Sequence, residues 1–225
     1  MSAAPLAVLF DAYGTLFDVH SVALAAEQLF PGQGQALSQA WRDKQIEYSR
    51  IRSQSQRWVP FWDVTRAALR FVAARLGLPL DAAGEDRLMG EYRHLAAFPE
   101  NREVLLALQA RGVRAGILSN GDHAMLEVSV KSAGFDGLLD PLLSAEDVRR
   151  FKTDAAVYDL GPRALACRAE QILLVSSNGW DAIGATWYGY TTLWVNRGGL
   201  PLEQLDCMPT RTGTSLRDVL TFFPA

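Results

Sequence analysis

The amino-acid sequence predicts an α/β protein, a doubly wound parallel sheet with a helical subdomain inserted after the first strand. Short apolar runs alternate with helical segments from about residue 98 onward, which is typical of parallel strands joined by right-handed crossovers. Residues 18–97 instead show helical periodicity and few strand signals. We therefore expect one domain from residues 1–17 and 98–225, and a helical subdomain from residues 18–97.

The first strand is predicted at Leu6–Phe10, an apolar run that is too short for a helix and typical of a strand buried on both faces. It ends at Asp11, and Gly14 and Thr15 follow at once. A carboxylate at this point costs desolvation free energy unless it is used or well hydrogen-bonded. Asp11 is therefore a candidate for chemistry, and the alternative is a carboxylate that only caps the following turn.

Four short helices are predicted within the insertion, because apolar side chains recur there at helical spacing. They cover residues 22–30, 37–48, 61–76 and 81–94. The third ends at Gly77, with Pro79 just beyond. The aromatic side chains of this subdomain are expected to lie mostly in its core: Trp41, Tyr48, Trp58, Phe61 and Trp62.

The remaining chain alternates between the two kinds of element. Helices are predicted at residues 104–111, 123–132, 154–167 and 180–188. Strands are predicted at residues 113–118, 142–143 and 172–175, with a last strand at residues 191–195.

Polar side chains stand at the ends of three predicted strands: Asp11; Ser119 and Asn120; and Ser176, Ser177 and Asn178. Asp181 lies just beyond the third group, and Lys152 precedes another helix at the same edge. The carboxyl ends of parallel strands share one edge of the sheet, where α/β proteins bind their ligands. The sequence therefore predicts one polar site built from these loops.

The composition of the 225 residues narrows the possible partners. A formal net charge of −3 without basic runs disfavours nucleic-acid binding. Cys167 and Cys207 lack metal-ligand spacing and suggest a reducing compartment. The N-terminal apolar run lacks a basic flank and is broken by Asp11, so we expect neither a signal peptide nor a membrane span, and a cytoplasmic protein. The three histidines are expected to be structural.

Four separated segments resemble the motifs of the haloacid dehalogenase superfamily: FDAYGTL, LSNG, FKTDAAVY and SSNGWD. The segments WRDKQIEYSRIR and VSSNGWDAIGA are similar to those of the (S)-2-haloacid dehalogenases. The resemblance implies a Rossmann-like core with a helical cap, a small 2-haloacid substrate, a halide product, no cofactor or metal, and possibly a homodimer. It implies hydrolysis of short (S)-2-haloalkanoic acids to (R)-2-hydroxy acids through an aspartyl ester.

The resemblance also implies roles for individual residues. Asp11 would attack C2 of the substrate, and Asp181, helped by Lys152, would activate the water that cleaves the ester. Four residues would orient these groups: Thr15, Ser119, Ser176 and Asn178. Ser119 and Asn120 would hold the substrate carboxylate, and Arg42 would attract the halide. An apolar wall would be formed by Tyr13, Ile46, Phe61 and Trp180. Tyr158 would bond Asp11 or Lys152. From the residues alone, Arg42 could equally be a surface arginine and Tyr158 a core tyrosine.

Two other functions are compatible with this fold: a phosphatase and a non-catalytic binding protein. Phosphatases of the superfamily carry a second aspartate two positions after the nucleophile, and this position is Tyr13, a poor acid near neutral pH. They also hold Mg²⁺ with an acidic cluster, whereas the last motif here has the single carboxylate of Asp181. After the dehalogenase and the phosphatase, a non-catalytic binding protein is the third hypothesis.

The sequence departs from the family pattern at three positions near the predicted site. Thr153 and Ala155 replace prolines, which predicts a less rigid loop around Lys152. Asp43 replaces a neutral residue and could pair with Arg42.

Overall fold

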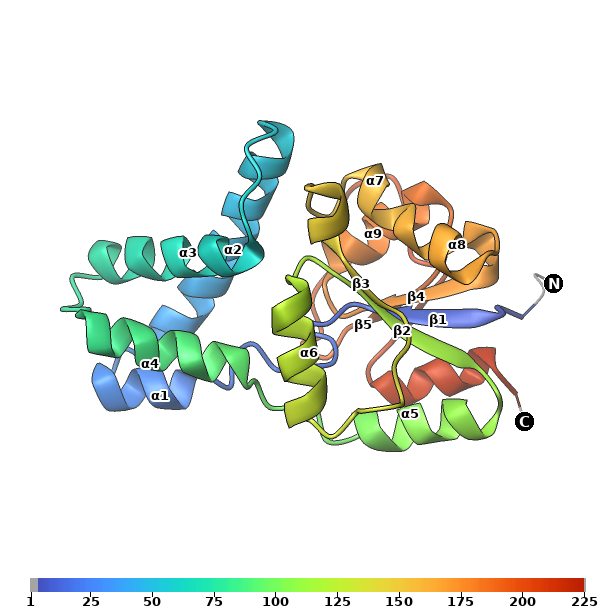
Figure 1. Cartoon of the computed structure of the whole chain (residues 1–225), viewed down its shortest axis with the longest axis horizontal. Coiled ribbons are helices and arrows are strands. Elements are labelled where there is room, and N and C mark those ends of the chain that lie inside the picture. Colours follow the sequence, from blue (N-terminus) through green and yellow to red (C-terminus); the bar gives the residue numbers. More distant parts are fainter. Residues whose placement is uncertain (1–3, 225) are drawn as a thin grey trace.

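A six-stranded parallel sheet forms the centre of the molecule, which a computed structural model describes for residues 4–224 (Figure 1). The strands, in chain order, are β1 (Ala7–Phe10), β2 (Arg114–Ser119), β3 (Leu142–Ser144), β4 (Ile172–Ser176), β5 (Thr191–Val195) and β6 (Arg211–Gly213). Their order across the sheet is β3-β2-β1-β4-β5-β6, and every neighbouring pair is parallel. The predicted doubly wound α/β fold is confirmed.

The order of the strands places a switch point between β1 and β4. From β1 the chain winds outward through β2 and β3, and then returns to the other side of β1 to form β4. Phe10 is in register with Ile117 of β2 and with Val175 of β4, so the three strands end at nearly the same level. Doubly wound sheets bind ligands in the crevice at this point. The residues that follow β1, β2 and β4 therefore converge there.

Helices cover both faces of the sheet (Figure 1). α5 (Asn101–Ala110) and α6 (His123–Ser132) lie on one face, and α7 (Ala155–Tyr158), α8 (Leu160–Leu165) and α9 (Gly179–Tyr188) lie on the other. Three short 3-10 helices complete the core, at Ala145–Val148, Ala169–Gln171 and Leu216–Phe222. β1 and β4 are completely buried, as their apolar sequences predict.

Two details of the predicted core are wrong. The helix expected at residues 154–167 is divided into α7 and α8, because Pro162 has no N–H to donate to the carbonyl of Tyr158. The hydroxyl of Tyr190 donates to that carbonyl instead. β5 is not the last strand, since β6 pairs with it along the edge of the sheet. β6 has only the residues Arg-Thr-Gly and therefore no apolar pattern to reveal it.

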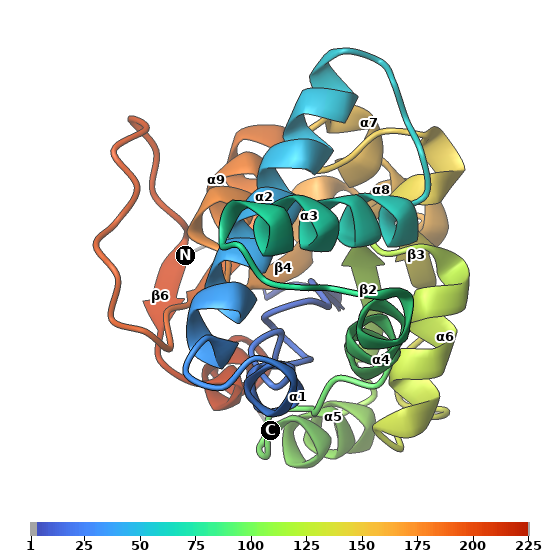
Figure 2. The same cartoon turned by 90° about the vertical axis from the view of Figure 1, so that its left-hand side faces the viewer.

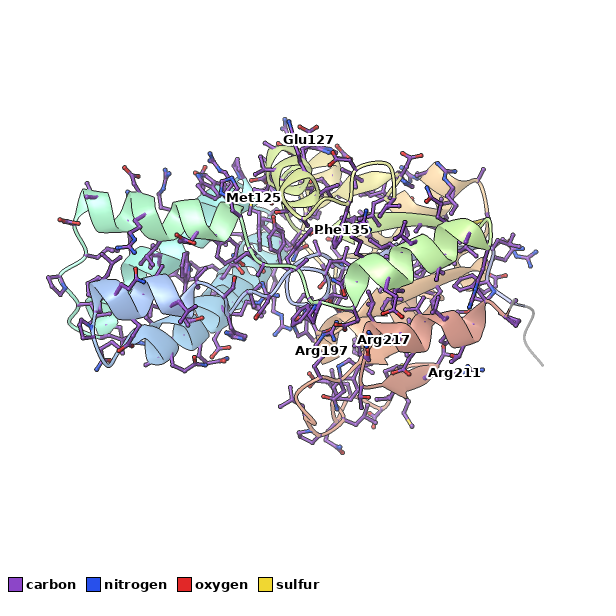
Figure 3. The ribbon with its side chains drawn as sticks, turned by 90° about the horizontal axis from the view of Figure 1, so that it is seen from below. Met125, Glu127, Phe135, Arg197, Arg211 and Arg217 are labelled. Carbon is purple, nitrogen blue, oxygen red and sulfur yellow. The ribbon has the colours of Figure 1, made fainter. Side chains whose placement is uncertain are left out.

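The segment that follows β5 is held against α5 by charged side chains. Arg197 pairs with Glu100, and Arg217 pairs with Glu103 at 2.7 Å. Both arginines are labelled in Figure 3, which shows them along the same side of the core. These ion pairs anchor the segment that follows β5.

Four helices form the inserted subdomain, and we call them the cap helices: α1 (Ala23–Leu29), α2 (Gly34–Gln54), α3 (Phe61–Arg75) and α4 (Ala82–Arg93). They pack together beside the carboxyl ends of the strands (Figures 1 and 2). The prediction of a short helix at residues 37–48 is wrong, because α2 has 21 residues. Its polar C-terminal end does not stop at residue 48 and continues over the core. Trp41 and Phe61 are buried, and the other three aromatic residues of the predicted core are half-buried. Within residues 4–224, no helix has the length and apolarity that a membrane crossing would need.

Candidate active site

Asp11 stands at the switch point of the sheet, directly after β1. Its backbone N–H donates to the carbonyl of Val175, which continues the pairing of β1 with β4 by one residue (2.9 Å). Its Oδ2 accepts hydrogen bonds from Thr15 Oγ1 (2.9 Å) and Asn178 Nδ2 (2.8 Å). Its Oδ1 accepts from Lys152 Nζ (3.2 Å). Thr15 lies in the turn that follows Asp11, whereas Asn178 and Lys152 come from other loops, so the carboxylate does more than cap that turn.

Lys152 connects two carboxylates. Its Nζ lies 3.2 Å from Asp11 Oδ1 and 2.8 Å from Asp181 Oδ2, and its side chain is fully buried. Burial alone would lower the pKa of Lys152, but the attraction of the two carboxylates outweighs it and raises that pKa. The ammonium form of Lys152 is therefore favoured between the two acids. Its loop lacks the two family prolines, and Asn120 Oδ1 holds it by accepting from the Lys152 N–H (2.8 Å).

Asp181 lies in the first turn of α9 and is completely buried. Its Oδ1 accepts a hydrogen bond from the Tyr158 hydroxyl (2.8 Å), and its Oδ2 accepts from Lys152. Burial raises the pKa of Asp181, and the nearby charge of Asp11 acts in the same direction. A carboxylate with a raised pKa is a better proton acceptor than an ordinary one. The expected partner of Tyr158 was Asp11 or Lys152, which is wrong, because its hydroxyl bonds Asp181.

Three other predicted site residues shape the loops around Asp11. Ser119 Oγ accepts from the N–H of Gly121 (3.0 Å), and Ser176 Oγ accepts from the N–H of Asn178 (3.1 Å). Asn120 uses its side-chain oxygen on Lys152, as described above. Gly121 is required here, because a Cβ at this position would lie 2.5 Å from the Tyr13 ring. The loops after β2 and β4 are thus fixed by their own short side chains.

Arg42 reaches this site from α2 of the cap. Its Nη2 donates to the carbonyl of Tyr13 (2.9 Å) and to Asn178 Oδ1 (3.3 Å), and its Nη1 donates to Gln45 Oε1 (2.7 Å). Arg42 is buried and is not a surface arginine. The carboxylate of Asp43 accepts from Gln39 Nε2 (3.1 Å), and the Arg42 guanidinium donates to Gln45, Tyr13 and Asn178 and not to Asp43, the partner that its sequence position had suggested.

A narrow cavity lies between the core and the cap. Its lining residues come from both parts of the chain: Asp11, Tyr13, Arg42, Ile46, Ser49, Phe61, Ser119, Asn120 and Trp180. These include all seven residues that were predicted to contact the substrate. The cavity measures about 10 Å³, which is about the space of one water molecule. A larger open pocket of about 530 Å³ shares the walls Arg42, Ile46 and Trp180.

Two residues of this region were not found by sequence reasoning. Gln45 joins the Arg42 guanidinium to the interior of the cap. Asp122 follows the LSNG segment and accepts the backbone N–H groups of Phe61 (2.7 Å) and Trp62 (2.8 Å). Burial raises the pKa of Asp122, while these two N–H groups act in the opposite direction. The signal for Asp122 was a carboxylate at a helix start, which is too common to suggest a contact with the cap.

The donor set at this edge is unsuited to a divalent metal. Within residues 4–224, no cluster of three or more His, Cys, Asp or Glu side chains could hold a metal ion. Both oxygens of Asp181 are already bonded, and a lysine ammonium lies between the two acids. Magnesium prefers several free oxygen ligands, which these residues do not offer.

Known proteins resemble this chain over nearly its whole length. The model of the haloacid dehalogenase-like hydrolases matches residues 5–189. The (S)-2-haloacid dehalogenase of Pseudomonas sp. (strain YL) is 44% identical over 216 residues, or 96% of this chain and 93% of that protein. An (S)-2-haloacid dehalogenase of Pseudomonas putida is 42% identical over 212 residues, which cover 94% of this chain and 93% of that protein.

Solved structures give the same result. A crystal structure of an L-2-haloacid dehalogenase that is 57% identical has a TM-score of 0.97 and covers 99% of this chain and 100% of its own. The L-2-haloacid dehalogenase of Xanthobacter autotrophicus, with chloropropionic acid covalently bound, has a TM-score of 0.90 at 34% identity and covers 98% of this chain and 100% of its own.

Proposed function

The chain belongs to the haloacid dehalogenase-like hydrolases and, within them, to the (S)-2-haloacid dehalogenases, and we propose that it hydrolyses short (S)-2-haloalkanoic acids to (R)-2-hydroxy acids. Its reaction breaks a carbon–halide bond. The observation that carries the proposal is the arrangement of Asp11, Lys152 and Asp181 at one strand edge, beneath Arg42 of the cap.

The first step is the attack of Asp11 on C2 of the substrate. A bond forms between a carboxylate oxygen and C2, the carbon–halogen bond breaks, and the halide leaves with the bonding electron pair. Oδ1 is the attacking oxygen, because its described hydrogen bond is to Lys152 alone, whereas Oδ2 is held by both Thr15 and Asn178. Attack from the side opposite the halogen inverts C2.

Two parts of the cap assist this step. The Arg42 guanidinium attracts the departing halide, and the apolar walls around it keep water away from the attacking carboxylate. Ser119 and Asn120 hold the substrate carboxylate from the core side of the cavity. Halide needs no proton in order to leave, so this step requires no acid in the cavity.

The second step is hydrolysis of the ester on Asp11. Water attacks the ester carbonyl carbon and gives one proton to Asp181, and negative charge develops on Oδ2. Thr15 and Asn178 already donate to Oδ2 at 2.9 and 2.8 Å, so they act as an oxyanion hole. When the bond between Oδ1 and the ester carbonyl carbon, which is Cγ of Asp11, breaks, Asp181 returns its proton to the alkoxide that leaves on C2. The second water proton passes to solvent, and the carboxylate of Asp11 is restored.

The alternative of a phosphatase is not favoured. Tyr13 occupies the position of the second aspartate, and burial raises the pKa of its hydroxyl, so it cannot act as a general acid near neutral pH. The relatives at 40% identity or more that are described above are dehalogenases.

We also propose the division of the chain into a core domain of residues 1–17 and 98–225 and a cap subdomain of residues 18–97. We also propose that the protein is cytoplasmic and forms a homodimer. Light scattering after size-exclusion chromatography measures the molar mass and tests the dimer.

The proposal is tested by measuring halide release from the two enantiomers of 2-chloropropionate. We expect release from the (S) enantiomer with formation of (R)-lactate, and none from the (R) enantiomer. Halide release from neither enantiomer, together with magnesium-dependent hydrolysis of an aryl phosphate, would show that the chain is a phosphatase.

A further inference from the structure

The first turn of α3 in the cap takes its capping group from the core. Pro60 precedes this helix and offers no side-chain acceptor to its first N–H groups, which would otherwise be unpaired. Asp122, in the loop between β2 and α6, accepts both: Oδ1 from Phe61 N–H (2.7 Å) and Oδ2 from Trp62 N–H (2.8 Å). Asp122 is 8% exposed, and Figure 1 shows the start of α3 lying toward α6.

Asp122 is available for this contact because another carboxylate serves its own helix. It occupies the N-cap position of α6, yet its side chain makes no capping bond there. The N–H of His123 donates instead to Glu146 Oε2 (3.1 Å). Glu146 therefore accepts from the start of α6 within the core, and Asp122 accepts from the start of α3 in the cap.

A chain of hydrogen bonds leads from this contact to the guanidinium of Arg42. The carbonyl of Phe61 accepts from Thr65 Oγ1 (2.8 Å), which accepts from Gln45 Nε2 (2.6 Å). Gln45 Oε1 accepts from Arg42 Nη1 (2.7 Å). The position of the first turn of α3 therefore affects two residues that line the narrow cavity with Asp11, namely Phe61 and Arg42.

The narrow cavity must widen before a substrate can enter. Its volume of about 10 Å³ suits one water molecule and is too small for a haloacid of several heavy atoms. The core and the cap supply opposite walls of this cavity, so their separation is the direct way to enlarge it. Contacts that cross from core to cap beside the cavity then decide how readily it closes again.

We propose that Asp122 is a positioning residue that latches the cap onto the core and so sets Phe61 and Arg42 for the reaction. Asp122 does not touch the reacting atoms. Substrate enters when the cap opens and is bound productively when the cap closes over it, and loss of the latch lowers the population of that closed, substrate-filled state. The apparent affinity for substrate falls by the same factor, whereas saturating substrate restores closure. The role in turnover rests on the proposed dehalogenation, but the latch itself does not.

The test compares three variants of the full chain. Asp122→Ala removes both acceptors of α3, Asp122→Asn keeps one carbonyl oxygen, and Glu146→Ala removes the matched acceptor of α6. For Asp122→Ala we expect KM to rise about tenfold, which corresponds to about 1.4 kcal/mol, with kcat changed by less than about twofold. We expect Asp122→Asn to fall between that variant and the unchanged protein, and Glu146→Ala to keep the original KM.

Amide hydrogen exchange gives a readout that does not depend on activity. We expect the N–H groups of Phe61 and Trp62 to exchange about tenfold faster in Asp122→Ala and at the original rate in Glu146→Ala. Unchanged exchange at these two amides, or an equal rise of KM in Asp122→Ala and Glu146→Ala, would overturn the proposal. If Asp122→Ala does not fold, the same comparison is made with Asp122→Asn. Faster exchange in a protein that releases no halide would leave the latch standing and refute only the proposed reaction.

Discussion

Replacing Tyr158 by phenylalanine tests whether Asp181 is the base of the second step. The substitution removes one hydroxyl, which donates to Asp181 Oδ1 at 2.8 Å inside the core. That hydrogen bond favours the ionised form of Asp181 and so holds its pKa below what burial alone would give. Without it, the pKa of Asp181 must rise.

The size of the effect follows from the strength of such a bond. A hydrogen bond to a charged group is worth about 1.5–3 kcal/mol, and one pH unit of titration corresponds to about 1.4 kcal/mol. Asp181 must be ionised to accept a proton, so turnover is present above its pKa and is lost below it. We therefore expect the acid limb of kcat to move upward by about one to two pH units in Tyr158→Phe.

The assay is kcat for halide release, measured from acid to neutral pH. The matched control is Tyr188→Phe, because Tyr188 packs against the Tyr158 ring at 5.9 Å while its hydroxyl bonds Asp159. We expect this control to keep the original acid limb. An acid limb that stays in place in Tyr158→Phe, or that moves equally in both variants, would refute Asp181 as the base.

Two further predictions concern the nucleophile and the metal. Asp11→Asn should release no halide while keeping its circular dichroism spectrum, because an amide is not a nucleophile; full activity, with deamidation excluded by mass spectrometry, would remove Asp11 from this role. Halide release should be unchanged by EDTA, because both oxygens of Asp181 are bonded to Lys152 and Tyr158 and the site lacks free carboxylates; a loss that Mg²⁺ reverses would contradict this reading of the donor set.

The sequence predicted the fold well because its strongest signals are local. β1 and β4 are buried on both faces, so each is a continuous apolar run that ends in polar residues. β6 could not be predicted, because an edge strand of three residues is held by pairing with β5 and not by its own apolar pattern. The division between α7 and α8 was signalled by Pro162, but its effect depends on Tyr190, which is distant in sequence.

The candidate site was predictable to a similar degree. Asp11, Lys152 and Asp181 were expected to meet because each lies at the carboxyl edge of a parallel sheet, and the structure brings them within hydrogen-bond distance. The hydrogen-bond partner of Tyr158 could not be predicted, because Asp11, Lys152 and Asp181 lie in one cluster. The sequence does not show that the hydroxyl points to Asp181. Asp122 was missed because its partners are backbone N–H groups, which leave no mark in the sequence.

The central claim is that Asp11 attacks carbon directly, and the source of the product oxygen tests it. In the covalent route, the first turnover transfers a carboxylate oxygen of Asp11 to C2, and water then replaces that oxygen in the enzyme. If Asp181 instead activated water to attack C2, the product oxygen would come from solvent at once. Both routes invert C2, so the configuration of the product does not separate them.

The measurement is a single turnover in ¹⁸O-water with enzyme in excess, followed by mass spectrometry of the product and of the peptide that contains Asp11. We predict 2-hydroxy acid that is mostly unlabelled, and label in Asp11. Fully labelled 2-hydroxy acid from that first turnover, with an unlabelled Asp11 peptide, would contradict the covalent mechanism.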